Sequence, residues 1–207
     1  MASFNHGAYS SEKSTSLVSP ITASAGLQVY IGTAPVHLAS DPYATVGKPI
    51  VCYDFASCEQ QLGYSENFKE FTLCEAMDFN FRVFNNAPVI FINVLDPSNT
   101  SHTKKNAEES IQVSADGVAV YSKKYVLLDT LTVKSGSKTL ERWTDYVAEF
   151  SDGGALSISL LTDIPSDNTL KVSSTSLDPQ AVNANDVVGG YNAKTGVETG
   201  IELVRRI

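Results

Sequence analysis

The sequence is poor in cysteine, in basic side chains and in long apolar runs. Its 207 residues include 15 Lys and Arg against 23 Asp and Glu, which gives a formal net charge of -8. An acidic chain without a basic stripe repels the phosphate backbone, so we expect no nucleic-acid partner. No stretch approaches the roughly 20 apolar residues of a membrane helix, and the N-terminus lacks the pattern of a signal peptide. We therefore expect a soluble protein that is made in a cytoplasm and does not insert into a membrane.

Cysteine is scarce and irregularly spaced, at Cys52, Cys58 and Cys74. An odd number with gaps of this kind fits neither a disulfide framework nor the paired CxxC of a zinc site. We expect buried free thiols, because an unpaired cysteine in a reducing compartment usually behaves as a small apolar residue.

Titratable residues form no catalytic or metal-binding pattern along the chain. The histidines His6, His37 and His102 fall in separate polar contexts without HExxH spacing, and we expect them on the surface. The pair Glu108-Glu109 falls in a polar stretch, and Asp152 begins a glycine-rich turn, where aspartate is typical for backbone reasons. The sequence therefore predicts neither an active site nor a cofactor, and no metal site.

Residues 1–25 differ from the rest of the chain because they are rich in Ser, Thr and Ala, with few apolar side chains. They could not close a core alone, so they form either an extended arm that pairs elsewhere or a disordered tail. Residues 26–96 instead predict a layered α/β unit. Its expected elements are strands at 27–34, 49–54 and 87–95, a helix at 55–62 with Asp54 as N-cap and Gly63 at its end, and an amphipathic helix at 68–84.

The stretch GLQVYIGTAPV, residues 26–36, has the outline of a phosphate-binding loop, since a strand is followed by a glycine. A Rossmann fingerprint needs three spaced glycines and a Walker loop needs GK[ST], whereas Gly32 stands alone. Pro35 also removes a backbone donor where the phosphate-binding helix would begin. We therefore interpret Gly32 and Pro35 as residues that shape a structural turn.

Residues 97–182 predict an all-β domain, sandwich-like or barrel-like, inserted into the α/β unit. After a polar linker at 96–110, short alternating runs are separated by turns at Asp116-Gly117, Ser135-Gly136 and Asp152-Gly153-Gly154. Trp143 and Tyr146 are expected to anchor its core. From residue 183 to 207 helical patterns return, with Thr199 as a candidate cap, so this segment should rejoin the α/β domain. We expect the chain to be the N-terminal portion of a longer protein, because its last amphipathic pattern is incomplete.

Taken in order, several stretches resemble the tail sheath proteins of contractile phages and of phage-tail-like bacteriocins. The stretches that carry this resemblance are MASFNHGAY, GLQVYIGTAPV, NNAPVIFINVLDP, DYVAEFSDGGALSI, LKVSSTSLDP and NANDVVGGYNAKTGVETGIELV. The resemblance covers nearly the whole chain, and the order of the stretches is more specific than any single one of them.

The resemblance implies a structural subunit that polymerises with itself into a helical sheath of stacked rings and contracts. It implies an inner tail tube protein, baseplate proteins and tail terminator proteins as partners, and a location in the tail of a virion or a related particle assembled in a host cytoplasm. Residues 1–25 would then add a strand to a neighbouring subunit. The residues expected to make that inter-subunit contact are Phe4, His6, Gly7 and Tyr9.

Two other classes of protein remain open from the residues alone. An α/β enzyme with a β insert would need a pocket with perturbed carboxylates or a Cys/His pair. A surface-binding module built on the β insert would show clustered exposed aromatic side chains. Neither sign is evident in the sequence, which favours the structural subunit.

Overall fold

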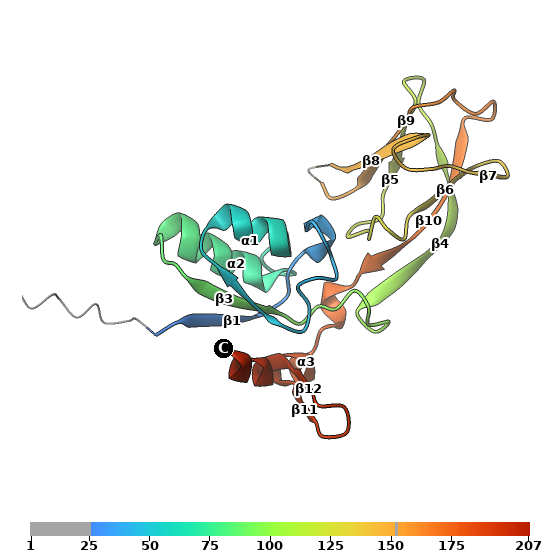
Figure 1. Ribbon diagram of the computed structural model, residues 1–207. Coiled ribbons are helices and arrows are strands. Elements are labelled where there is room, and N and C mark those ends of the chain that lie inside the picture. The colour runs from blue at the N-terminus through green and yellow to red at the C-terminus, as the bar shows by residue number, and fades with distance from the viewer. Residues whose placement is uncertain (1–25, 152) are drawn as a thin grey trace, which may run out of the picture.

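The computed structural model describes residues 26–151 and 153–207, which combine helices with several small sheets in a mixed α+β arrangement. Figure 1 shows two lobes: a first lobe, residues 26–95, and a β lobe, residues 103–177. A C-terminal unit, residues 178–207, returns beneath the first lobe. Within the described ranges, no helix has the length and apolar character needed to cross a bilayer.

The first lobe is built on a three-stranded sheet in the order β1-β3-β2. Strand β1 (Gln28–Gly32) runs parallel to β3 (Val89–Asn93), and β2 (Pro49–Cys52) runs antiparallel to it. All five residues of β3 are buried. The sequence predicts this central place, because a strand that is apolar on both faces needs cover on both sides.

Two helices lie on one face of this sheet (Figure 1). Helix α1 (Phe55–Leu62) begins where predicted, since Asp54 Oδ1 accepts a hydrogen bond from the Ser57 amide at 2.8 Å. It ends at Gly63, whose φ of +73° favours glycine.

The second predicted helix, at 68–84, is wrong in its start and in its type. Helix α2 spans only Thr72–Met77, and it continues as the π-helix η2 (Asp78–Val83). The first free amides of α2 bond to the exit of β1: Thr72 N donates to Thr33 Oγ1, and Leu73 N donates to the Thr33 carbonyl. These bonds fix the helix start at Thr72, and periodicity alone does not reveal them.

The C-terminal unit covers the other side of the sheet (Figure 1). It consists of α3 (Ala184–Val188), a hairpin of β11 (Gly190–Asn192) and β12 (Val197–Thr199), and the 3-10 helix η4 (Gly200–Arg206). The hairpin was not predicted, because its polar residues carry little strand signal. Helix η4 contacts β1 and β2, and its Leu203 is buried.

The β lobe contains two sheets that enclose a second apolar core. One sheet has the order β4 (Thr103–Gln112), β10 (Thr169–Leu177), β6 (Thr132–Ser135) and β7 (Lys138–Thr139). The other has the order β5 (Val118–Tyr121), β9 (Leu156–Leu160) and β8 (Tyr146–Phe150). The antiparallel pairs β6–β7 and β8–β9 are joined by short connections, which agrees with the alternating pattern of the sequence, whereas the other pairs join strands that are distant in sequence.

The predicted linker at 96–110 is wrong, because most of it forms strand β4. Its sequence, TKKNAEESIQ, is polar, but the strand pairs with β10 along nearly its whole length. Backbone pairing needs no apolar side chain, and a partner strand can override weak strand propensity.

The aromatic core of the β lobe was predicted only in part. Tyr121 and Tyr146 are buried, whereas Trp143 is 66% exposed and lies outside the core. Trp143 also has a φ of +72°, which is not a strand conformation. The alternation of inward and outward side chains in a strand therefore does not apply at this position.

Gly32 lies at the closest approach of β1 to α2, and its replacement tests that contact. A Cβ atom at Gly32 would lie 2.2 Å from Thr72 Oγ1, which accepts a hydrogen bond from Thr33 N. We expect Gly32→Ala to lower the free energy of unfolding by about 1–3 kcal/mol, measured by urea denaturation, because the packed helix cannot retreat freely. Gly26→Ala, where a Cβ meets nothing within 4 Å, is the matched control and should change stability little. Equal effects of the two variants would contradict this packing role.

Candidate functional site: the junctions between lobes

The most elaborate polar and aromatic contacts lie where segments distant in sequence meet. One group surrounds His102, where the chain leaves the first lobe and later returns; we call it the His102 junction. The other joins the first lobe to the β lobe around Tyr125 and His37; we call it the lobe contact. Both involve residues that the sequence assigns to loops, so tertiary structure brings them together.

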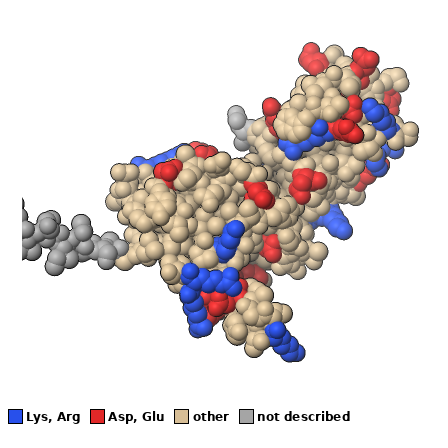
Figure 2. Space-filling model, viewed as in Figure 1, with Lys and Arg blue, Asp and Glu red and all other residues tan. Residues whose placement is uncertain are grey.

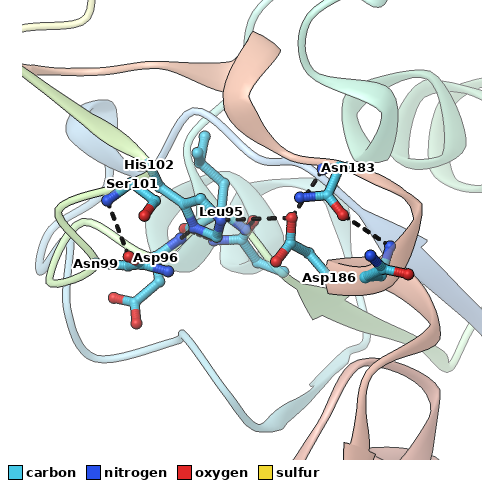
Figure 3. Close-up of polar contacts among 9 residues, drawn as sticks. Leu95, Asp96, Asn99, Ser101, His102, Asn183 and Asp186 are labelled. Atoms are coloured by element: carbon cyan, nitrogen blue, oxygen red, sulfur yellow. Dashed lines mark hydrogen bonds and ion pairs between the residues drawn. The ribbon is translucent and has the colours of Figure 1, made fainter.

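The His102 junction links three chain segments (Figure 3). His102 Nδ1 accepts a hydrogen bond from the Asp96 amide at 3.1 Å, just after β3. The His102 carbonyl accepts from the Asp178 amide at 2.8 Å, just after β10. Its Nε2 lies 3.6 Å from Asp186 Oδ2 on α3. A single buried residue therefore holds the exit from the first lobe, the return from the β lobe and the C-terminal unit.

Neighbouring polar groups fix the partners of His102 (Figure 3). Asp186 Oδ2 also accepts from the Asn183 amide at 2.8 Å, which closes the capping box of α3. On the other side, buried Asn93 accepts from the Leu95 amide and donates to the Leu95 carbonyl. The side chain of Asn93 thus fixes the backbone at Leu95, directly before the Asp96 amide that donates to His102.

The lobe contact depends on Tyr125, which the β lobe inserts against the first lobe. Its hydroxyl donates to Glu70 Oε2, and its ring packs edge-on against Phe71, with centroids 5.1 Å apart. Burial and this bond to a carboxylate raise the pKa of Tyr125 to about 12. A φ of +57° is uncommon for an aromatic residue, and the surrounding contacts hold Tyr125 in it.

Further side chains connect the two lobes around Tyr125. Phe150, at the end of β8, packs edge-on against His37 with centroids 5.5 Å apart. Tyr43 donates to Asp129 Oδ2 at 2.7 Å across the same contact. Leu127 and Leu177 belong to the apolar core of the first lobe although they lie beyond its sequence range. The two lobes therefore share part of one core.

His37 and His102 are both buried, so the prediction of surface histidines is wrong for these two residues. The sequence signal that His37 is buried was its position between two aliphatic residues, Val36 and Leu38. For His102, the flanking sequence is polar, and its contacts include residues distant in sequence, Asp178 and Asp186. His6 lies outside the described residues.

Burial leaves His37 without hydrogen-bond partners among the described residues and shifts its titration. Its Nδ1 atom is fully covered, and neither ring nitrogen bonds to residues 26–151 or 153–207. Desolvation lowers the pKa of His37 from 6.5 to about 3, because the charged ring would lose its hydration. His37 is therefore neutral at neutral pH, and one of its nitrogens is an acceptor.

The three cysteines are free and buried, which confirms that prediction. The hydrogen bond to Cys52 and burial raise the pKa of Cys58, and burial raises that of Cys74 to about 12. A thiol must ionise to act as a nucleophile, so the raised pKa makes Cys58 and Cys74 poor nucleophiles at neutral pH.

Charged side chains form scattered pairs rather than a site. Glu108 and Glu109, now on β4, pair with Lys134 at 2.8 Å and with Lys123 at 3.0 Å. Figure 2 shows acidic and basic side chains interspersed over the visible face. In residues 26–151 and 153–207, no three His, Cys, Asp or Glu side chains converge as metal ligands. Solvent screens exposed pairs of this kind, so they contribute little to stability.

The predicted contact residues divide between undescribed and structural positions. Phe4, His6, Gly7 and Tyr9 lie outside the described residues. Gly32 ends β1, where the α2 contact leaves no room for a side chain. Pro35 precedes the 3-10 helix η1 (Val36–Leu38), and its carbonyl accepts from the Leu38 amide at 2.9 Å.

Comparison with known proteins gives a relationship for the chain as a whole. Over 205 residues it is 28% identical to the tail sheath protein of Burkholderia phage BcepMu. The chain is similar to a phage tail sheath protein. The match covers 99% of this chain but only 40% of the phage protein, so the chain spans well under half the length of that relative. No protein-family model matches the chain, and no solved structure matches it.

The lowered pKa of His37 predicts that stability falls on acidification. Below pH 6.5 the unfolded chain binds a proton at this residue, whereas the folded chain does not until about pH 3. We expect wild type to lose about 2 kcal/mol more than His37→Leu between pH 6.5 and pH 5, from about 1.4 kcal/mol per pH unit. Urea denaturation of both proteins at the two pH values measures this difference. Parallel pH profiles would contradict the assignment.

The His102 junction predicts local loosening when its imidazole is lost. His102→Leu leaves the Asp96 amide without an acceptor, so we expect a loss of about 1–3 kcal/mol. Hydrogen exchange should accelerate at the Asp96 amide and in α3. Asp186→Asn should have a smaller effect, since its amide oxygen can still accept from the Asn183 amide. Asp163→Asn, at an exposed position, is the control; unchanged exchange in His102→Leu would refute the role of this junction.

Proposed function

We propose that this chain is part of a structural subunit of a contractile phage tail sheath, which polymerises with itself around an inner tail tube. One observation carries the proposal: the match to a tail sheath protein runs almost from end to end of the chain. A match confined to one motif would indicate a shared local element, whereas continuous similarity indicates a shared architecture. The role proposed is structural rather than catalytic, and the location is the tail of a virion or a phage-tail-like particle.

For the domain organisation, we propose a layered α/β sheath domain interrupted by an inserted β domain. The contact that supports this division is the His102 junction, where the entry to and the return from the insert lie side by side. Residues 26–96 and 183–207 would form the α/β part, and residues 97–182 the insert. Adjacent entry and exit points are what an insertion into an existing domain requires.

For assembly, we propose that residues 1–25 act as an arm that adds a strand to a neighbouring subunit. Support for strand addition comes from β1 and β2, which are the edge strands of the β1-β3-β2 sheet among the described residues. Edge strands present unpaired backbone groups that can pair with a strand of another chain. They are therefore docking sites, but they also favour aggregation. Contraction would be a change between two packings of the same subunits while such arms keep neighbours connected. Baseplate and tail terminator proteins would bound the sheath.

Electron microscopy of the complete gene product, alone and with residues 2–20 deleted, tests both the function and the arm. We expect tubes or stacked rings from the intact product, and folded monomers from the deletion variant because its arm cannot reach a neighbour. Circular dichroism of the variant controls for folding. Monodisperse particles from the intact product would overturn the sheath proposal, whereas tubes from the deletion variant would overturn the arm alone.

A further inference from the structure

Two features of the structure could serve a contact with a second copy. One is an exposed tryptophan with a positive φ, and the other is a cavity beside the lobe contact, whose buried histidine has no hydrogen bond within residues 26–151 and 153–207. Their chemistry is complementary, and each lies on a different part of the chain.

Trp143 is presented by a rigid loop of the β lobe. The Trp143 amide donates to the Tyr146 carbonyl at 2.7 Å, and buried Asp145 accepts from the Glu141 amide at 2.9 Å and from Lys138 at 3.1 Å. The Arg142 guanidinium lies 4.7 Å from the indole centroid. These contacts hold the backbone of Trp143 at a φ of +72° while its indole is exposed. Backbone strain of this kind concentrates at functional positions.

The cavity lies between the first lobe and the β lobe and has a volume of about 500 Å³. Its lining combines aromatic side chains with polar ones. The aromatic residues are His37, Tyr64, Phe71, Tyr125 and Phe150, and the polar residues are Ser65, Glu66, Asn67, Lys124 and Ser151. The volume is in the range of about 300–1,000 Å³ that is typical of binding sites, where a few polar groups fix the orientation of what binds. Here the imidazole of His37, which has no hydrogen bond among the described residues, is such a group.

We propose that Trp143 of one copy inserts into this cavity of a neighbouring copy and donates its indole N–H to His37. The proposal rests on the proposed self-assembly and adds to it a specific contact. Aromatic rings favour edge-to-face packing, and an indole buries about 150–250 Å² while needing one acceptor. Nδ1 of His37 is fully covered, so the acceptor for the indole is Nε2, which is free to accept because His37 is neutral at neutral pH.

The charges around the two features support this pairing. The cavity rim carries Glu66 and Lys124, and the loop of Trp143 carries Arg142 and Glu141. None of these four side chains has an ion-pair partner in the described part of the chain, whereas each could meet an opposite charge across the contact. Complementary rims of this kind steer association and set its register.

The contact is head-to-tail, because the two copies use different surfaces. Repetition of such a contact gives an open helical array unless the ring closes, which agrees with a tube built from stacked subunits. Since both lobes line the cavity, its occupation also fixes the orientation of the β lobe against the first lobe. Assembly and lobe geometry are therefore coupled through one side chain.

Sedimentation and fluorescence of the 207-residue chain test this contact directly. Trp143 is the chain's one tryptophan, so a blue shift of its emission with rising protein concentration would report burial between copies. We expect association to weaken at least 30-fold in Trp143→Ala, as for an interface hot spot, and about fivefold in His37→Leu, which loses the acceptor. Val120→Ala, an exposed apolar position on the same lobe, is the matched control and should associate as wild type does.

A mixing experiment identifies the head-to-tail geometry. Trp143→Ala lacks the inserted side chain, and Leu38→Arg places a cation on the cavity rim against Arg142. Each variant alone should remain monomeric, but their mixture should form 1:1 dimers, because one intact loop and one intact cavity remain. Wild type that stays monomeric with unshifted emission at millimolar concentration, or a mixture without dimers, would overturn the contact.

Assembly of the complete gene product separates this contact from the proposed function. Tubes that form equally well with Trp143→Ala would overturn the contact and leave the sheath function standing. Conversely, wild-type product without tubes would overturn the sheath function, while sedimentation of the 207-residue chain would still decide whether Trp143 enters the cavity.

Discussion

Strands β4 and β10 run antiparallel beside one another, and the first lobe lies at one end of the pair (Figure 1). β4 begins where the chain leaves the first lobe, and β10 ends where the chain returns to it. Their pairing therefore brings these two connections between the lobes side by side. The His102 junction can form only at that point, since it requires Asp96, Asp178 and Asp186 within reach of one imidazole. The C-terminal unit, which covers one side of the sheet of the first lobe, depends in turn on that junction.

The lobe contact adds rigidity that the β4–β10 pair alone would not provide. Two strands form a flexible connection, whereas Tyr125, Phe150 and His37 pack at several points away from the crossing. A cavity remains within this contact, so the interface is fixed at its edges but open in one place. In a protein whose proposed work is mechanical, such an arrangement lets a neighbouring subunit influence how the lobes are held.

The same packing sets the protonation of several titratable groups in the described residues. Burial lowers the pKa of His37 and raises the pKa of the Cys58 and Cys74 thiols, so the histidine stays neutral and these two thiols stay protonated. His102 has its Nδ1 committed to a backbone amide. These histidines are thus involved in packing and in hydrogen bonds within the fold.

Local patterns in the sequence determined the elements whose signals are local: the buried strand at Val89–Asn93, the capped helix Phe55–Leu62 and the glycine turns of the β lobe. The resemblance of several stretches, in their order along the chain, to tail sheath proteins was the basis for expecting a sheath-like protein. Tertiary structure alone decided that polar residues 103–112 form a strand, that Trp143 is exposed, and that His37 and His102 are buried. The physical reason is that burial and backbone pairing depend on partners distant in sequence, and a partner such as β10 or α3 leaves no trace in the segment it covers.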